Sequence, residues 1–175
     1  MTKLKAVLKS SFVPIILMLL SVLVFLFSGN LITSDPGLTP GTIFGYEFII
    51  GFTTPIGSVP DPGNQVTGLG FSAILLLIPV MGLSGIVLLV LEMFKVDIPN
   101  VKVIVMVLFI VVGILCLLPV QLASYYRIAE TGTQFIPLNS EDLHLSFGGY
   151  MSGFFAFISA GLLGIDMIEL KKKTN

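Results

Sequence analysis

The chain has 175 residues, of which 55% are hydrophobic and 11% are charged, and its mean hydropathy is +1.04. Water-soluble domains carry about 25% charged residues, and disordered chains combine low hydrophobicity with high net charge, so the composition excludes both classes. The net charge of −1 argues against a nucleic-acid-binding surface, and a single cysteine, Cys116, excludes an internal disulfide framework. The composition therefore predicts an integral membrane protein.

Four long stretches are almost free of charged residues, and each can hold the roughly 20 apolar residues that a membrane-spanning helix needs. We predict spans at about 11–29, 69–91, 102–123 and 145–168. The connections are then two outer loops at about 30–68 and 124–144 and one inner loop at about 92–101. The predicted fold class is an all-α membrane protein. Residues 1–175 form one domain, a bundle of four transmembrane helices with a small, partly β outer-loop subdomain.

The first span has an alternative interpretation as a cleaved signal peptide, because three lysines precede its apolar run. Signal cleavage requires small residues one and three positions before the cut. Cuts after Ser28 or Gly29 would place Leu26 or Phe27 at the third position, and both are large. We therefore expect the segment to be retained as a membrane anchor.

Positive charge is distributed unevenly between the two sides of the predicted membrane domain. Eight of the nine Lys and Arg residues fall near the N-terminus, around the 92–101 loop or near the C-terminus, whereas Arg127 alone falls in an outer loop. Cytoplasmic loops carry an excess of Lys and Arg, so both termini are predicted to be cytoplasmic. The outer loops lack cysteines and Asn-x-Ser/Thr acceptors, which favours a prokaryotic plasma membrane.

The first outer loop is long enough to have a function or structure of its own. Its segment Ile43–Phe52 alternates large apolar residues with smaller ones, a pattern that predicts a β-strand. We take Phe44, Tyr46, Glu47 and Phe48 as candidate docking residues for a partner. Packing within the loop or against the lipid interface, and a re-entrant element, remain alternatives. In the second outer loop, residues 134–137 predict a short strand beside the first loop.

The fourth span carries a stripe of small residues: Gly149, Gly153, Ala156, Ala160 and Gly164. At 100° per residue these positions lie within about 80° of one another on a helix, and small residues let two membrane helices approach closely. The partner of this small-residue stripe is either another span of the chain or another protein. Gly82 and Gly85 in the second span are candidate partners.

Two prolines and one charged residue within the predicted spans lead to further predictions. Pro79 and Pro119 are expected to kink the second and third spans, because proline removes a helical hydrogen bond. Asp166 lies five residues before Lys171, so we expect an interfacial role in which lysines of the C-terminal tail or water satisfy its charge.

Sites for chemistry are scarce. His144 is the only histidine, which excludes bis-histidine haem ligation and disfavours zinc. No Walker A, GxSxG or HExxH motif occurs. Glu141, Asp142 and His144 form either a cation- or pH-sensing cluster or a solvated helix cap. We predict that the protein is not an enzyme and has no catalytic residues, cofactor or metal.

In outline, four spans with a long first outer loop resemble the claudin and tetraspanin architectures. The chain lacks the tryptophan and the paired outer cysteines of claudins. It also lacks the cysteines of tetraspanins. No family is assigned. The expected function is that of an accessory or scaffold subunit of a membrane complex. It would dock through its outer loops and the small-residue stripe, and its partners would be the bilayer and another membrane protein or copies of itself.

Two alternatives stay open. One is a small oligomeric channel or transporter component, for which the candidate lining residues are Ser72, Ser84, Gln121 and Ser152. The other is an enzyme or lipid-handling protein that uses Glu47 or the cluster at 141–144.

Overall fold

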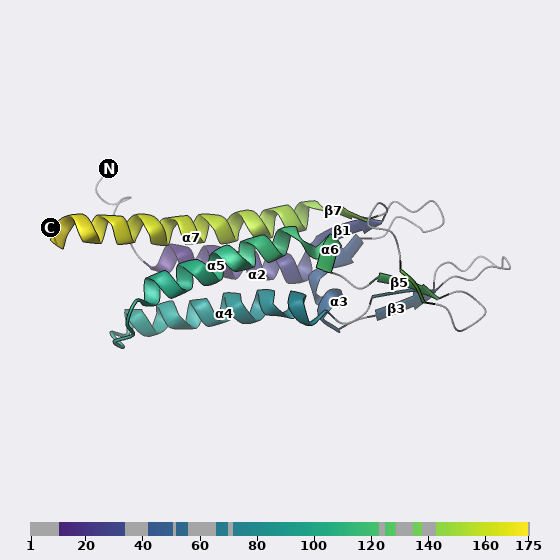
Figure 1. Ribbon diagram of the computed structural model, residues 1–175, viewed down its shortest axis with the longest axis horizontal. Coiled ribbons are helices and arrows are strands. Elements are labelled where there is room, and N and C mark those ends of the chain that lie inside the picture. Colours follow the sequence, from purple (N-terminus) through teal and green to yellow (C-terminus); the bar gives the residue numbers. More distant parts are fainter. Residues whose placement is uncertain are drawn as a thin grey trace.

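The computed structural model describes residues 11–33, 42–50, 52–55, 66–69, 72–122, 125–128, 135–137 and 143–174. This part of the chain is mostly helical, as predicted. Its four long helices lie side by side along the longest axis of the molecule (Figure 1): α2 (Phe12–Phe27), α4 (Ala73–Met93), α5 (Val101–Leu117) and α7 (Phe147–Thr174).

Two of these helices are long and apolar enough to cross a membrane by length and composition. They are α4 over its whole length and α7 over Phe147–Glu169. The other two, α2 and α5, are also apolar but have only 16 and 17 residues. Four hydrophobic segments are therefore helical, and two of them meet the length expected of a membrane span.

The bundle has two chemically different ends (Figure 1). We call one the lysine end, which contains the α4–α5 connection at 94–100 and the last turns of α7. We call the other the strand end, where the β-strands join the helices. Between the ends, α5 packs on α7 and α4, and α2 packs on α7 and α4.

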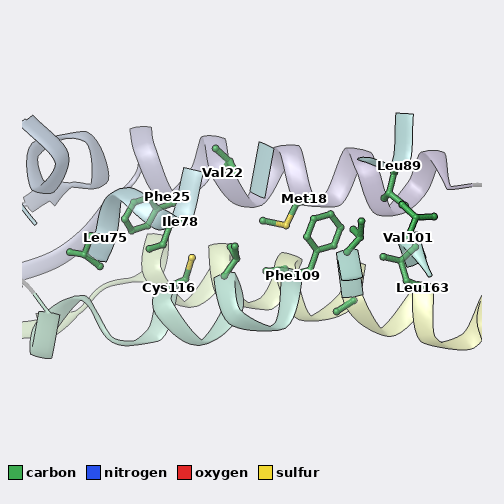
Figure 2. Close-up of a cluster of buried hydrophobic side chains, with 14 residues drawn as sticks. Met18, Val22, Phe25, Leu75, Ile78, Leu89, Val101, Phe109, Cys116 and Leu163 are labelled. Carbon is green, nitrogen blue, oxygen red and sulfur yellow. The ribbon is translucent and has the colours of Figure 1, made fainter. Parts of the chain in front are cut away.

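The space between the helices is filled by apolar side chains along the length of the bundle (Figure 2). Phe25, Leu75 and Cys116 lie toward the strand end, and Leu89 and Leu163 lie toward the lysine end. All five side chains are almost completely buried. The described part of the bundle therefore has an apolar core that runs between its two ends.

The strands form two antiparallel sheets. One sheet has the order β2 (Thr42–Phe44), β1 (Gly29–Thr33), β7 (Leu143–Leu145). The other has the order β3 (Phe52–Pro55), β4 (Val66–Leu69), β5 (Tyr125–Ile128), β6 (Phe135–Pro137). Both sheets combine segments from the two predicted outer loops. Strand β6 falls where a strand was predicted, but β5 lies between it and the first-loop strand β4.

The strand predicted over Ile43–Phe52 is wrong, because most of this segment is a short helix, α3 (Gly45–Ile50). The carboxylate of Glu47 accepts a hydrogen bond from the backbone N–H of Phe44 at 2.7 Å. A glutamate at the third helical position that reaches back to the residue before the helix is half of a capping box. This local bond stabilises a helical turn in a segment whose alternating pattern is typical of a strand.

The third predicted span also differs from the structure, because Pro119 ends the helix where a kink was predicted. Helix α5 stops at Leu117, and a new helical turn, α6 (Pro119–Leu122), begins at the proline. Proline is well suited to a first helical position, where its missing N–H has no helical partner. Pro79, in contrast, lies inside α4.

Candidate functional site

The small-residue stripe of α7 lies against α5 of the same chain. A Cβ atom added to Gly153 would lie 3.1 Å from Leu117 Cδ2 and 3.3 Å from the carbonyl oxygen of Gly113. One added to Gly164 would lie 3.5 Å from Met106 Sδ. The remaining members, Gly149, Ala156 and Ala160, are buried. All of the stripe except Gly164, which is half-buried, is thus inside the bundle.

Gly82 and Gly85 do not face α7, so their predicted pairing with the stripe is wrong. A Cβ atom at Gly82 would lie 2.7 Å from Val22 Cγ2 on α2. One at Gly85 would lie 2.4 Å from Phe109 Cε1 on α5. These glycines make room for large side chains of two other helices.

Buried serine hydroxyls join α2 to α7. Ser21 Oγ donates a hydrogen bond to the carbonyl oxygen of Ser152 at 2.7 Å, and Ser159 Oγ donates to that of Pro14 at 2.6 Å. The Ser152 hydroxyl donates within its own helix to the carbonyl of Gly149 at 3.0 Å. Polar bonds of this kind hold helices together where water is absent. Our sequence reasoning missed Ser21 and Ser159, although an isolated serine in an apolar span is a signal of such a bond.

A cluster of three charged side chains joins three helices at the lysine end. Lys102 on α5 hydrogen-bonds Asp166 on α7 through its Nζ and the Asp166 Oδ2 atom. The same Nζ lies 3.6 Å from Oε1 of Glu92 on α4. Lys102 and Asp166 are only 19% and 18% exposed. Among the residues that the structure describes, no donor lies within hydrogen-bonding distance of the buried Oε2 atom of Glu92.

This charged cluster supplies a partner for Asp166 that was not predicted. Lysines of the C-terminal tail or water were expected to satisfy Asp166; the structure pairs it with Lys102, 64 residues away in the chain, and the side chains of Lys171, Lys172 and Lys173 lie outside the described part. A single sequence gives no direct signal for a contact at such a separation. The charge at the edge of each span was visible, whereas the choice of partner depends on how α5 and α7 pack.

The candidate docking residues lie on β2 and α3 at the strand end. The rings of Phe44 and Tyr46 stack with their centroids 5.7 Å apart, and Tyr46 remains 39% exposed. The carboxylate of Glu47 caps the helix, as described above. Phe48 lies within α3. Among the side chains of this helix that the structure describes, the most exposed apolar one is Ile50, at 75%, a residue that we had not singled out.

The candidate channel-lining residues do not surround a common path through one chain. Ser72 begins α4, where its hydroxyl donates to the carbonyl of Leu122 at 3.1 Å, and Ser152 is bound within the core. Ser84 and Gln121 are exposed on the outside of the bundle.

Of the cluster predicted at 141–144, Glu141 and Asp142 lie outside the described residues. His144 lies on β7, paired with Ile32 of β1, and is exposed. In the described part of the chain, no three His, Cys, Asp or Glu residues gather as a possible metal site.

No family model matches this chain, and no curated protein or solved structure does either.

Proposed function

We propose that this chain is a non-enzymatic integral membrane protein that crosses a prokaryotic plasma membrane four times and serves as an accessory or scaffold subunit of a membrane complex. In this proposal the lysine end faces the cytoplasm, so that both termini are inside. The strand end lies outside and carries the docking surface.

The outer face of the bundle supports the membrane placement. Each of the four long helices exposes large apolar residues, among them Leu23 on α2, Leu83 on α4, Val107 on α5 and Phe154 on α7. Soluble monomers rarely expose contiguous apolar patches larger than a few hundred Å², whereas lipid tails provide an apolar environment for this whole face. At 1.5 Å per residue, the shorter α2 and α5 measure about 24–26 Å, and the bilayer thins locally around short spans at modest cost.

The filled core is the observation that best supports the proposed scaffold role. Apolar side chains occupy the axis from one end of the bundle to the other, and the buried hydroxyls of Ser21 and Ser159 are engaged with backbone carbonyls of neighbouring helices. The interior is therefore suited to holding the helices in place. The surface available to another protein is the strand end, where α3 presents Tyr46 and Ile50.

Site-specific photo-crosslinking in the native membrane tests this proposal. A benzophenone-bearing amino acid replaces Ile50 at the strand end, and a matched control carries it at Ile114, which is exposed on α5 three residues before the end of that helix. We expect a discrete adduct with one other membrane protein from position 50 and none from position 114. Because Tyr46 stacks on Phe44, Ile50 is the position that perturbs the local structure least.

Adducts with a second copy of this chain, or no adduct at all, would contradict the scaffold proposal. The self-adduct would favour the alternative of an oligomeric channel or transporter component. One feature is consistent with that alternative: Ser84 exposes a hydroxyl on α4 beside the exposed apolar residues Leu83 and Val87. Its test is solute flux through liposomes that contain the purified chain.

A further inference from the structure

The turn that follows α4 is strained at a lysine. The N–H of Lys95 donates to the carbonyl of Glu92 at 2.9 Å, and that of Val96 donates to the carbonyl of Leu91 at 3.1 Å. This pair of bonds is a Schellman motif, in which the residue after the helix cap adopts the left-handed conformation and is usually glycine. Here that residue is Lys95, with φ of 61°. A side chain with a Cβ atom is disfavoured in this conformation.

This lysine is exposed, unlike the other cation near the turn. Lys102, the other cation near the turn, is engaged by Asp166 and Glu92 within the charged cluster. Lys95 is exposed and forms no ion pair among the residues that the structure describes. One carboxylate, that of Asp97, lies two residues further along the turn and is also exposed.

Apolar side chains flank the exposed cation on both sides. Phe94 is 78% exposed, the highest value among the large apolar residues of the bundle, and Met93 and Val96 are also exposed. The combination of exposed apolar residues and a lysine at the end of an apolar helix suits the boundary between acyl chains and anionic headgroups.

We propose that Lys95 is retained in the left-handed position because its ammonium group binds the anionic headgroup of a phospholipid at the cytoplasmic face, with Phe94 inserted beside it. The inference rests on the membrane placement in the proposed function and is independent of the scaffold role. It assigns the turn at 93–97 as a lipid-binding surface.

The test compares two glycine substitutions in the same turn. Lys95→Gly removes the strain and the charge together, whereas Asn100→Gly removes the same kind of strain, at φ of 56°, and leaves the charge in place. The full chain is placed in vesicles of phosphatidylcholine alone or mixed with phosphatidylglycerol. Unfolding on heating is followed by maleimide labelling of Cys116, the buried, sole cysteine.

In phosphatidylcholine, we expect Lys95→Gly to melt about 2–4 °C above the unsubstituted chain, and Asn100→Gly to gain less, because asparagine adopts the left-handed conformation more readily than lysine. In the mixed vesicles, we expect the melting temperatures of the unsubstituted chain and of Asn100→Gly to rise by about 2–4 °C relative to phosphatidylcholine alone, because both keep the contact between Lys95 and a headgroup. Lys95→Gly lacks this contact, so its melting temperature should rise much less.

An equal gain for Lys95→Gly in the mixed vesicles would overturn the proposal, and so would the absence of any gain for the unsubstituted chain. Equal stabilisation by inorganic phosphate in phosphatidylcholine vesicles would also overturn it, since the turn would then bind anions in general. None of these outcomes bears on the crosslink from position 50, so failure of this inference and failure of the scaffold proposal are separable.

Discussion

The two ends of the bundle hold their helices together by different means. At the strand end, glycines lie directly against backbone carbonyls: a Cβ atom at Gly45 would clash with the carbonyl oxygen of Phe25, and one at Gly148 would clash with that of Gly29. At the lysine end, the contact is made by the charged side chains of Glu92, Lys102 and Asp166.

This difference determines how each end should respond to substitution. A clash with a backbone atom can be relieved only by moving a helix or strand, because the carbonyl has no rotamers. Charged side chains are longer and can rearrange, and partial exposure lets water replace part of a lost interaction. We therefore expect the strand end to be intolerant of small changes and the lysine end to tolerate larger ones.

The largest effect is expected from Gly45→Ala at the strand end. The added methyl group must displace either α3 or the end of α2, and such overpacking costs about 3 kcal/mol. The measurement is thermal unfolding in lipid vesicles, followed by labelling of Cys116.

The matched control for this change is Gly161→Ala on α7, where an added Cβ atom meets nothing within 4 Å. This variant should be as stable as the unsubstituted chain or gain up to about 1 kcal/mol from helix propensity. Similar melting temperatures for the two variants would contradict the close approach of α3 to α2.

An intermediate effect is expected from Asp166→Asn at the lysine end. It leaves the partly buried Lys102 with only the more distant carboxylate of Glu92, and we expect the free energy of unfolding to fall by about 2 kcal/mol, which is below the range for a fully buried pair.

Glu92→Gln should change the stability by about 0.5 kcal/mol or less, because Lys102 Nζ lies 3.6 Å from its carboxylate.

The double variant Lys102→Met with Asp166→Leu sharpens the same comparison. Replacing both members of an ion pair by apolar residues of similar size is often neutral, and the one charge of the cluster that then lacks a partner is that of Glu92, which lies 3.6 Å from Lys102 Nζ and is 28% exposed. It should therefore be more stable than Asp166→Asn. If the double variant is the less stable of the two, the lysine end depends on the ion pair as strictly as the strand end depends on its glycines.

A smaller effect than that of Asp166→Asn is expected between the two ends, at the hydroxyl bond from α7 to α2. Ser159→Ala removes the bond to the carbonyl of Pro14 and should cost about 0.6–1 kcal/mol. Ser84→Ala, on the exposed face of α4, is the control and should have an effect near zero. Chemical denaturation of the two variants, measured side by side, resolves this difference, and equal midpoints would show that the bond contributes nothing to stability.

Hydropathy located the helices well, because the need to pair backbone groups in an apolar environment acts on every residue of a long segment. The predicted spans at 11–29 and 145–168 correspond to α2 at Phe12–Phe27 and α7 at Phe147–Thr174. That all four helices cross a bilayer remains a prediction, since only α4 and α7 reach the length of a span.

Features that depend on a single contact could not be predicted from the sequence. The alternating pattern around Glu47 predicted a strand, but the segment is helical, and the carboxylate of Glu47 accepts a hydrogen bond from the N–H of Phe44 at the start of the helix. The partner of Asp166 and the neighbours of Gly82 and Gly85 depend on which helix faces which, and hydropathy is nearly the same on every side of these helices.

The hydrogen bonds between α2 and α7 also have a consequence for biosynthesis. Their donors and acceptors are separated by 131 and 145 residues, so α2 leaves the ribosome long before the helix that completes its contacts. Until α7 is made, the hydroxyl of Ser21 and the carbonyl of Pro14 have no partner on α7. A chain that ends before residue 147 would therefore lack both hydrogen bonds to α2. Among the long helices that the structure describes, the one made first and the one made last are thus in direct contact.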